Sequence, residues 1–438
     1  MTRLTTAGLL AAGLMTAPAA AQPLTRAEAV SRAVAANPQV KLSLEQVAML
    51  DGQIVQARAD ALPEITWSSV GLRSRDPGLL NSPNFDQFPD EFRTALNPIP
   101  ANAFATSADL RQTLFSFKLG KALDAARTAR EAAALDVERA RHATALDAIR
   151  AYNQLLFALE QERVIRANVD ARERHLESAR NRLAAGVATE LEVLRADVDL
   201  ENQRAELQRA GNDVAAARAI LNTVMLRPTG TPIAPADTLA VVPFTVAFEE
   251  AVREAIAARP ELESLRLQEE VRDDLIGVAA ADGKPRFDLA ASYGFSVRRP
   301  RNLFDLDYTR WSATVTVKVP IFDGWRVSGA VAQARAQRNS VTHQIAALEN
   351  QIRLEVQSAW DALALVDRTI QAAELNVTQA RRAFEMTEAN YGLGAATPLD
   401  VIDAQQALRE AENIRNQALY SHANARATLQ YVMGREPN

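Results

Sequence analysis

Apolar and polar residues alternate along two stretches in the second half of the chain. Residues 287–297 read FDLAASYGFSV and residues 311–321 read WSATVTVKVPI, with an apolar residue at every second position. Such alternation indicates strands with one apolar and one polar face. Each stretch has the length of about 11 residues that a tilted strand needs to cross a membrane. A half-buried sheet in a soluble protein has the same pattern, so both interpretations stay open on these strands alone.

The first half of the chain contains a weaker version of the same pair of strands. The stretch EITWSSVGLRS alternates poorly, whereas FATSADLRQTLF keeps Phe104, Ala108, Leu110 and Leu114 on one side. We therefore predict four strands, near residues 64–73, 103–115, 286–298 and 309–321. The proline-rich segment 73–102 is predicted to be either an extracellular cap or a disordered loop without function.

Two very long helices are predicted to follow the strand pairs. Neither Gly nor Pro occurs in residues 121–185 or 330–391, and each segment would form a helix of about 90–100 Å. The second segment has an apolar or aromatic residue at every seventh position. These residues are Val356, Leu363, Ile370, Val377, Phe384 and Tyr391. A heptad pattern of this kind requires partner helices.

The whole plan occurs twice along the chain. The passage AAGVATELEVLRADVDLENQ, which begins at Ala184, aligns with GLGAATPLDVIDAQQALREAE at an offset of 208 residues. Gly186 then matches Gly394, and Thr189 matches Thr397. Each copy runs short helix, strand, loop, strand, long helix, turn, short helix. We assign repeat one to residues 22–235 and repeat two to residues 236–438, because an internal repeat dictates the architecture.

Residues 1–21 are predicted to be a secretory signal peptide. Arg3 gives a positive start, residues 7–15 form a short apolar core, and residues 19–21 offer a cleavage site of small residues. The rest of the chain has no apolar run of about 18 residues, so only strands are expected to enter a bilayer. The chain has no cysteine, which excludes a lipid anchor, and its net charge of −5 argues against nucleic acid.

Four strands cannot close a barrel by themselves, and an open sheet edge is not tolerated in lipid. If these strands enter a membrane, they must be pooled between subunits. Three chains would supply twelve strands.

The sequence resembles the TolC-like family of outer-membrane efflux proteins. The most specific pieces are LRQTLFSFKLGKAL and VTVKVPIFDGWRVSGAVAQA at the strand-to-helix junctions, and YGLGAATPLDVIDAQQAL at the second turn. The resemblance implies a mostly α fold with an internal tandem repeat. In this fold a trimeric twelve-stranded membrane β-barrel, with four strands per chain, continues into a long antiparallel coiled-coil α-barrel.

The same resemblance implies a function and a set of partners. The chain would be the passive exit duct of a tripartite efflux pump or type I secretion system, in the outer membrane of a Gram-negative bacterium with a long periplasmic extension. It would be a homotrimer in outer membrane lipid, recruited by a periplasmic adaptor (membrane fusion protein) and an inner-membrane pump. The resemblance implies no enzymatic activity and no cofactor. The transported substrate is not specified.

The two repeated turns are expected to form the periplasmic mouth of the channel. Thr397, Pro398 and Asp400 read as a helix start, and Thr189 with Glu192 reads as a capping box. Asp400 and Asp403 also lie three residues apart, hence on one helix face. A ring of these carboxylates around the mouth would attract cations, and in the family aspartates at matching positions line the entrance.

Repeat one carries Glu192 and Arg195 at the equivalent places. Arg195 would either partly neutralise the ring or pair with Asp199 on its own helix.

Opening is expected to move the hairpin tip around Tyr391 and Thr397 outward. In some relatives a tyrosine and an arginine near this tip hold the closed state. Tyr391 matches that tyrosine, but Ala396 stands where the arginine would be, so we do not expect the same latch.

The glycine-containing turns are the expected docking sites for an adaptor. Glycine there also terminates the helices, and both roles can hold together. The docking candidates are Gly186, Val187, Thr189, Gly392 and Gly394.

The sequence contains no sign of catalysis or metal binding. The four histidines, at positions 142, 175, 343 and 422, do not have metal-ligand spacing, and no nucleophile, phosphate-loop or paired-carboxylate motif occurs. Two rival interpretations remain. A periplasmic adaptor has one helical hairpin rather than two, and a soluble coiled-coil scaffold would leave the aromatic strands unexplained.

Overall fold

The computed structural model describes residues 23–75, 77, 87–91 and 100–437. The predicted signal peptide, residues 1–21, lies outside these residues, and so does most of the 73–102 segment. The described chain is mostly helical, and none of its helices is both long enough and apolar enough to span a membrane.

The chain divides into two compact units, each built from segments of both repeats. The first unit comprises Met1–Leu42, Val137–Pro260 and Asn350–Asn438, and the second comprises Ser43–Asp136 and Glu261–Glu349. The long helices α4 (Phe117–Ala184) and α8 (Arg326–Gly392) run from the second unit into the first. Each compact unit combines segments of both sequence repeats, so the division into units does not test the repeat boundaries. The boundaries at 22–235 and 236–438 therefore stay a prediction.

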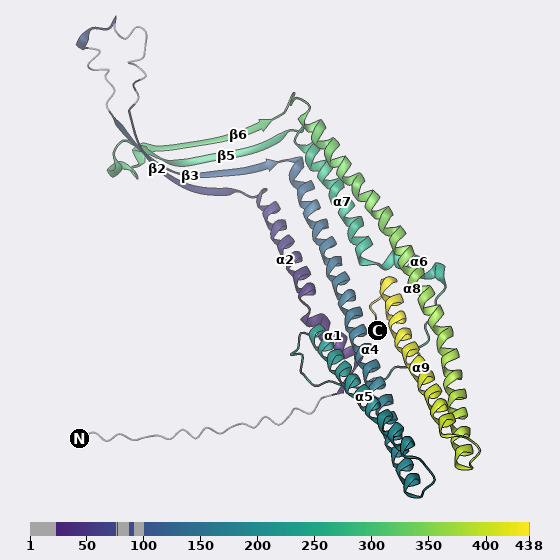
Figure 1. Ribbon diagram of the computed structural model, residues 1–438. Coiled ribbons are helices and arrows are strands. Elements are labelled where there is room, and N and C mark those ends of the chain that lie inside the picture. The colour runs from purple at the N-terminus through teal and green to yellow at the C-terminus, as the bar shows by residue number, and fades with distance from the viewer. Residues whose placement is uncertain (1–22, 76, 78–86, 92–99, 438) are drawn as a thin grey trace, which may run out of the picture. The chain divides into compact units, whose positions relative to one another are not determined.

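The second unit contains an antiparallel sheet with the strand order β2-β3-β5-β6 (Figure 1). The strands are β2 (Glu64–Ser74), β3 (Ala101–Phe115), β5 (Arg286–Val297) and β6 (Thr309–Lys318). Strand β6 ends three residues before the expected position 321. Pro320 follows closely and has no N–H for the ladder, which limits the strand. Helix α7 (Pro260–Ala281) and most of α2 (Pro38–Ala59) belong to the same unit.

The register of the sheet separates an apolar face from a polar one. Tyr293 pairs with Trp311 and Leu289 with Val315, so aromatic and aliphatic side chains of neighbouring strands share a face. On the opposite face, Asp109 accepts hydrogen bonds from the hydroxyls of Ser107 (2.9 Å) and Ser292 (2.6 Å). The apolar face is exposed within the chain, since Trp311 is 74% accessible.

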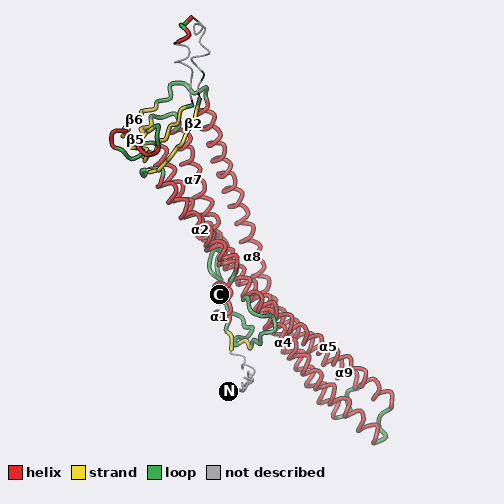
Figure 2. Tube along the Cα trace, turned by 90° about the vertical axis from the view of Figure 1, so that its left-hand side faces the viewer, coloured by secondary structure: helices red, strands yellow, loops and turns green. Residues whose placement is uncertain are grey.

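The first unit contains two helical hairpins. Helix α4 turns back into α5 (Glu190–Val224), and α8 turns back into α9 (Pro398–Val432). In Figure 2 the two turns are the green ends of red hairpins. The unit also holds α1 (Arg26–Ala36), α6 (Phe248–Ala258), and the short parallel strands β1 (Pro23–Leu24) and β4 (Ala234–Pro235).

The helices of this unit pack through the seams that the heptad pattern predicts. Ile352, Val356, Leu363 and Ile370 are all at most 4% accessible, which confirms the seam over this part of α8. A second cluster surrounds Tyr152, whose hydroxyl lies 2.8 Å from the carbonyl oxygen of Leu24. Prolines separate α1 from α2 and α6 from α7, because the residue before a proline disfavours the helical conformation.

Candidate functional site

The turns at the ends of the two hairpins have the same backbone geometry. Gly186 and Gly394 have φ angles of +73° and +74°, in the left-handed region that favours glycine. The N–H of Val187 donates to the carbonyl of Arg182 (3.0 Å), and the N–H of Ala395 donates to that of Asn390 (2.8 Å). These bonds are equivalent under the offset of 208 residues, and both complete a glycine C-cap.

Of the two glycines expected in the second turn, only Gly394 has this special conformation. Gly392 is the last residue of α8.

Threonine begins the returning helix in both hairpins. The Thr397 hydroxyl accepts from the N–H of Asp400, and the Asp400 carboxylate accepts from the N–H of Thr397 at 2.7 Å, which confirms a complete capping box. Thr189 accepts from the N–H of Glu192 at 3.3 Å, but the reciprocal backbone bond of the expected box is not formed.

The cap affects the charge of Asp400. Hydrogen bonds from the Thr397 hydroxyl and backbone N–H hold the pKa of the Asp400 carboxyl below its ordinary value of 3.8. Asp400 and Asp403 are both exposed. The Asp400 carboxylate therefore carries its charge at neutral pH, and both side chains are accessible to an ion path. Their assembly into a ring stays a prediction.

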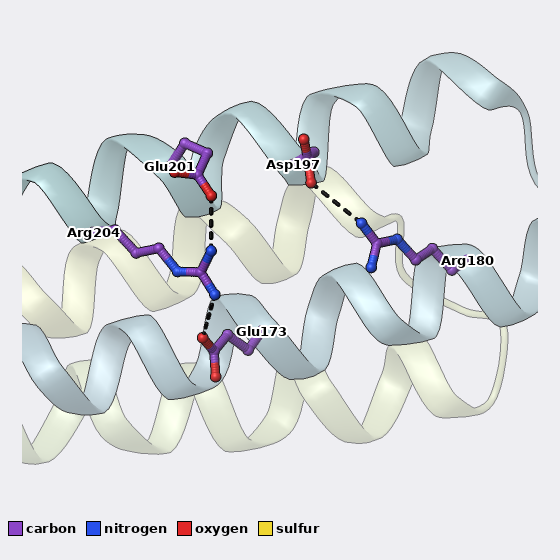
Figure 3. Close-up of polar contacts among 5 residues, drawn as sticks. All are labelled: Glu173, Arg180, Asp197, Glu201 and Arg204. Atoms are coloured by element: carbon purple, nitrogen blue, oxygen red, sulfur yellow. Dashed lines mark hydrogen bonds and ion pairs between the residues drawn. The ribbon is translucent and has the colours of Figure 1, made fainter.

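Ion pairs join the two helices of each hairpin near the turns. In the first hairpin Arg204 of α5 contacts Glu173 of α4 (2.7 Å) and its own neighbour Glu201 (2.8 Å), and Arg180 contacts Asp197 at 3.4 Å (Figure 3). The second hairpin has Arg381 and Glu412 at 3.0 Å.

The second ion pair is the first with its charges exchanged, because Glu173 aligns with Arg381 and Arg204 with Glu412. Each hairpin is thus held at the same level by its own pair.

Tyr391 has an arginine partner that the sequence did not indicate. The Arg182 guanidinium donates to the Tyr391 hydroxyl, and its carbon lies 5.7 Å from the centre of the ring. Arg182 is in the first hairpin and Tyr391 is in the second. At the repeat offset of 208 residues, Tyr391 aligns with Leu183, and Arg182 directly precedes Leu183 in the sequence. The repeat alignment could therefore have indicated this arginine.

A pocket of about 610 Å³ lies between the hairpins beside this contact. It is lined by four of the predicted site residues, Glu192, Arg195, Tyr391 and Thr397, together with Arg182, His175, Asp199 and apolar residues that include Leu194 and Leu399. Asp400, Asp403 and the turn glycines do not line it. The half-buried His175 has its pKa lowered by burial and by the nearby positive charges of Arg172 and Arg182.

The expected pairing of Arg195 with Asp199 is replaced by a contact between helices. Asp199 lies 3.6 Å from Arg172 of α4, whose side chain is almost fully buried. A buried guanidinium requires a charged partner more than an exposed one does. Arg195 is exposed, so Asp199 pairs with the buried Arg172 instead.

The tips also expose apolar side chains. Leu393 is 83% accessible, Val187 65%, Leu399 63% and Leu191 55%. Apolar residues gathered at exposed turns are typical of a docking surface for another protein. Within the described parts of the chain, no group of three or more His, Cys, Asp or Glu is placed to hold a metal ion.

Comparison with known proteins identifies the family. Residues 29–225 and 251–435 match the model of the outer membrane efflux protein family. Outer membrane protein OprJ of Pseudomonas aeruginosa is 27% identical over 394 residues, which cover 86% of this chain and 77% of OprJ. The alkaline protease secretion protein AprF of the same organism is 25% identical over 344 residues, 76% of this chain and 70% of AprF.

The crystal structure of the Campylobacter jejuni CmeC outer membrane channel has a similar fold. Its TM-score is 0.77 at 18% identity, covering 93% of this chain and 85% of CmeC. The family resemblance of the sequence is thereby confirmed, and a match over both repeats decides against a periplasmic adaptor or a soluble scaffold.

Proposed function

Because the chain belongs to the outer membrane efflux protein family, we propose that three copies assemble into one exit duct that opens at the helical tips. The chain is an efflux channel of the outer membrane of a Gram-negative bacterium. The proposal adds the subunit number, the gate and the partners. It assigns no catalytic step to the chain.

The observation that carries the proposal is the sheet with two unpaired edges. In the described chain β2 and β6 each have one neighbour, and the apolar face of the sheet is exposed. Backbone groups at an open edge cannot be satisfied in lipid. The β2 edge of one copy and the β6 edge of the next can satisfy each other.

Pore size supports three copies rather than two. Two chains would give eight strands, and an interior of about that size is filled by side chains or holds one small ligand. Three chains give twelve strands and a wider interior. Asp109 and the serine hydroxyls on the polar face would then line water, as the walls of a duct require.

The gate in this proposal is the contact between Arg182 and Tyr391. It joins the first hairpin to the second within each chain, at the end where the duct meets the periplasm. Breaking it would free the second hairpin to move outward. The exposed apolar residues of the tips would meanwhile bind the periplasmic adaptor, which in turn recruits an inner-membrane pump.

Among the relatives, the name of AprF refers to secretion of alkaline protease, whereas the name of OprJ refers to no cargo.

Planar-bilayer recordings test the channel and its predicted carboxylate ring together. The double variant Asp400→Asn/Asp403→Asn keeps acceptor oxygens for the helix cap but removes the charges. We expect its cation-to-anion permeability ratio to fall several-fold, since a carboxylate about 4 Å from an ion is worth about 1 kcal/mol even in water. In the wild type, the contribution of Asp400 to selectivity should persist as the pH falls to the ordinary aspartate pKa of 3.8 and decline only below it, because the pKa of Asp400 is lowered.

Thr397→Val is the matched control, since it removes the capping hydroxyl and leaves both charges. We expect unchanged selectivity at neutral pH. If the double variant is as selective as the wild type, the prediction of a carboxylate ring is wrong. If the wild-type protein forms no channel at all, the proposed function is wrong.

A further inference from the structure

The turn between β5 and β6 carries an unusual concentration of positive charge. Residues 298–310, which comprise the turn and the first two residues of β6, contain four arginines and two aspartates, in a chain whose net charge is −5. The arginines are Arg298, Arg299, Arg301 and Arg310, and all four are exposed. Among the described residues none of them forms an ion pair, so their charges are available to a partner outside the chain.

The turn has a defined structure in which the Asp305 carboxylate is occupied. It contains two short 3₁₀ helices, η2 (Pro300–Asn302) and η3 (Leu306–Tyr308). Asp305 caps the second of these and accepts from the N–H of Asp307 at 3.2 Å. The ring of Phe304 packs edge-on against Phe295 of β5, with 5.8 Å between centroids. Arg298, Arg299 and Arg301 are thus presented on a folded turn, and Arg310 at the start of β6.

Large exposed apolar residues lie next to the arginines. Tyr293 and Trp311 form a cross-strand pair at this end of the apolar face, and Trp311 is 74% accessible. Phe304 and Leu306 in the turn are 69% and 75% accessible. Tyrosine and tryptophan concentrate where hydrocarbon meets lipid headgroups, so the arginines lie at the level expected for phosphates.

The direction of the chain places this turn on the outer side of the membrane. Strand β5 follows α7 and β6 leads into α8, so the turn lies at the end of the sheet away from these helices (Figure 1). With the helices on the periplasmic side, as the proposed function requires, the turn faces the outer leaflet.

We propose that the turn 298–310 binds phosphate groups of glycolipids in the outer leaflet. Arginine forms bidentate, charge-assisted hydrogen bonds with phosphate. The neighbouring aromatic residues favour a lipid over a soluble anion, because they would contact acyl chains beside each headgroup. The turn would then hold the channel at a fixed depth through its lipid contacts. The inference rests on the proposed function for the orientation of the sheet.

The test is lipid binding by the full chain, purified in detergent and followed by native mass spectrometry with diphosphoryl lipid A. The triple variant Arg298→Gln/Arg299→Gln/Arg301→Gln should bind about a hundredfold more weakly, since each arginine near an anionic lipid surface contributes about fivefold. The wild type should bind monophosphoryl lipid A less well than the diphosphoryl form, and phosphatidylcholine least.

Two further variants separate charge from folding. Arg335→Gln/Arg353→Gln/Arg368→Gln removes the same charge from exposed positions of α8 and should leave lipid binding unchanged. Arg298→Lys/Arg299→Lys/Arg301→Lys keeps the charge and should retain most of the affinity.

Three results would overturn the inference: full binding by the glutamine variant at 298, 299 and 301, equal loss in the α8 variant, or displacement of lipid A by inorganic phosphate at matched concentration. Channel formation in planar bilayers is recorded for every variant. A wild-type protein that forms channels but does not bind lipid A would refute this inference alone. Failure of the wild type to form channels would refute the proposed function.

Discussion

Replacement of Arg182 by alanine is expected to raise the mean conductance of the channel in planar bilayers at least tenfold. The substitution removes a charged hydrogen bond to the Tyr391 hydroxyl and a cation–π contact with its ring. For a partly exposed pair, these interactions together contribute about 2 kcal/mol, or roughly thirtyfold in the equilibrium between closed and open hairpins. Each chain of the trimer would lose the same contact, so the effects should reinforce one another.

Two matched variants show which part of the contact matters. Tyr391→Phe removes the hydroxyl but keeps the ring, and should raise conductance less than Arg182→Ala does. Arg180→Ala removes an arginine two positions away that pairs with Asp197 inside the first hairpin (Figure 3). It should leave conductance unchanged. Equal effects of Arg180→Ala and Arg182→Ala, or no effect of either, would mean that the contact does not gate the duct.

The double variant Val187→Asp/Leu393→Asp is expected to abolish assembly with the adaptor while leaving the channel intact. Both side chains are mostly exposed, so the substitutions cost little stability. An apolar anchor in a docking interface commonly contributes about 2 kcal/mol, and an unpaired charge in its place costs more. The readout is the amount of adaptor and pump that copurifies with the channel after cross-linking in the native host. We expect a loss of at least tenfold.

Leu393→Met is the control, because it keeps the apolar volume and should preserve assembly. Leu393 is a better test than Gly394, since any side chain at Gly394 would also strain a backbone with φ of +74°. Copurification at the wild-type level would exclude the tips as the docking surface. Loss of channels in bilayers would show that these positions serve folding.

Much of the tip geometry could be predicted from sequence because it is local. A glycine after a helix and a threonine before the next specify a turn through short-range hydrogen bonds, and the two copies of the turn agree in the structure. The heptad at Val356, Leu363 and Ile370 likewise identified buried positions, since helical periodicity alone determines which residues share a face.

Contacts between the hairpins could not be predicted in this way. Periodicity shows that Tyr391 lies on the seam but not which residue of another helix faces it, so Arg182 was missed. The local spacing rule paired Asp199 with Arg195, whereas the buried Arg172 is its actual partner. In both cases the actual partner is distant in the sequence, and only the packing of the helices brings it close.

Cysteine cross-linking of the sheet edges tests the central claim most directly, namely that neighbouring chains share one closed barrel. The chain has no native cysteine, so every disulfide formed is an engineered one. One cysteine is fixed on β6 at Ser312, and a second is moved along β2 through residues 64–74. As a control, cysteines at Ala105 of β3 and Ser296 of β5, which pair within the chain, should give only internal disulfides.

The account predicts that at least one β2–β6 combination produces a covalent species with three times the mass of the chain, formed in membranes at high yield. Failure of every position along β2 to link chains, with protein recovered as a monomer in buffer without detergent, would contradict it.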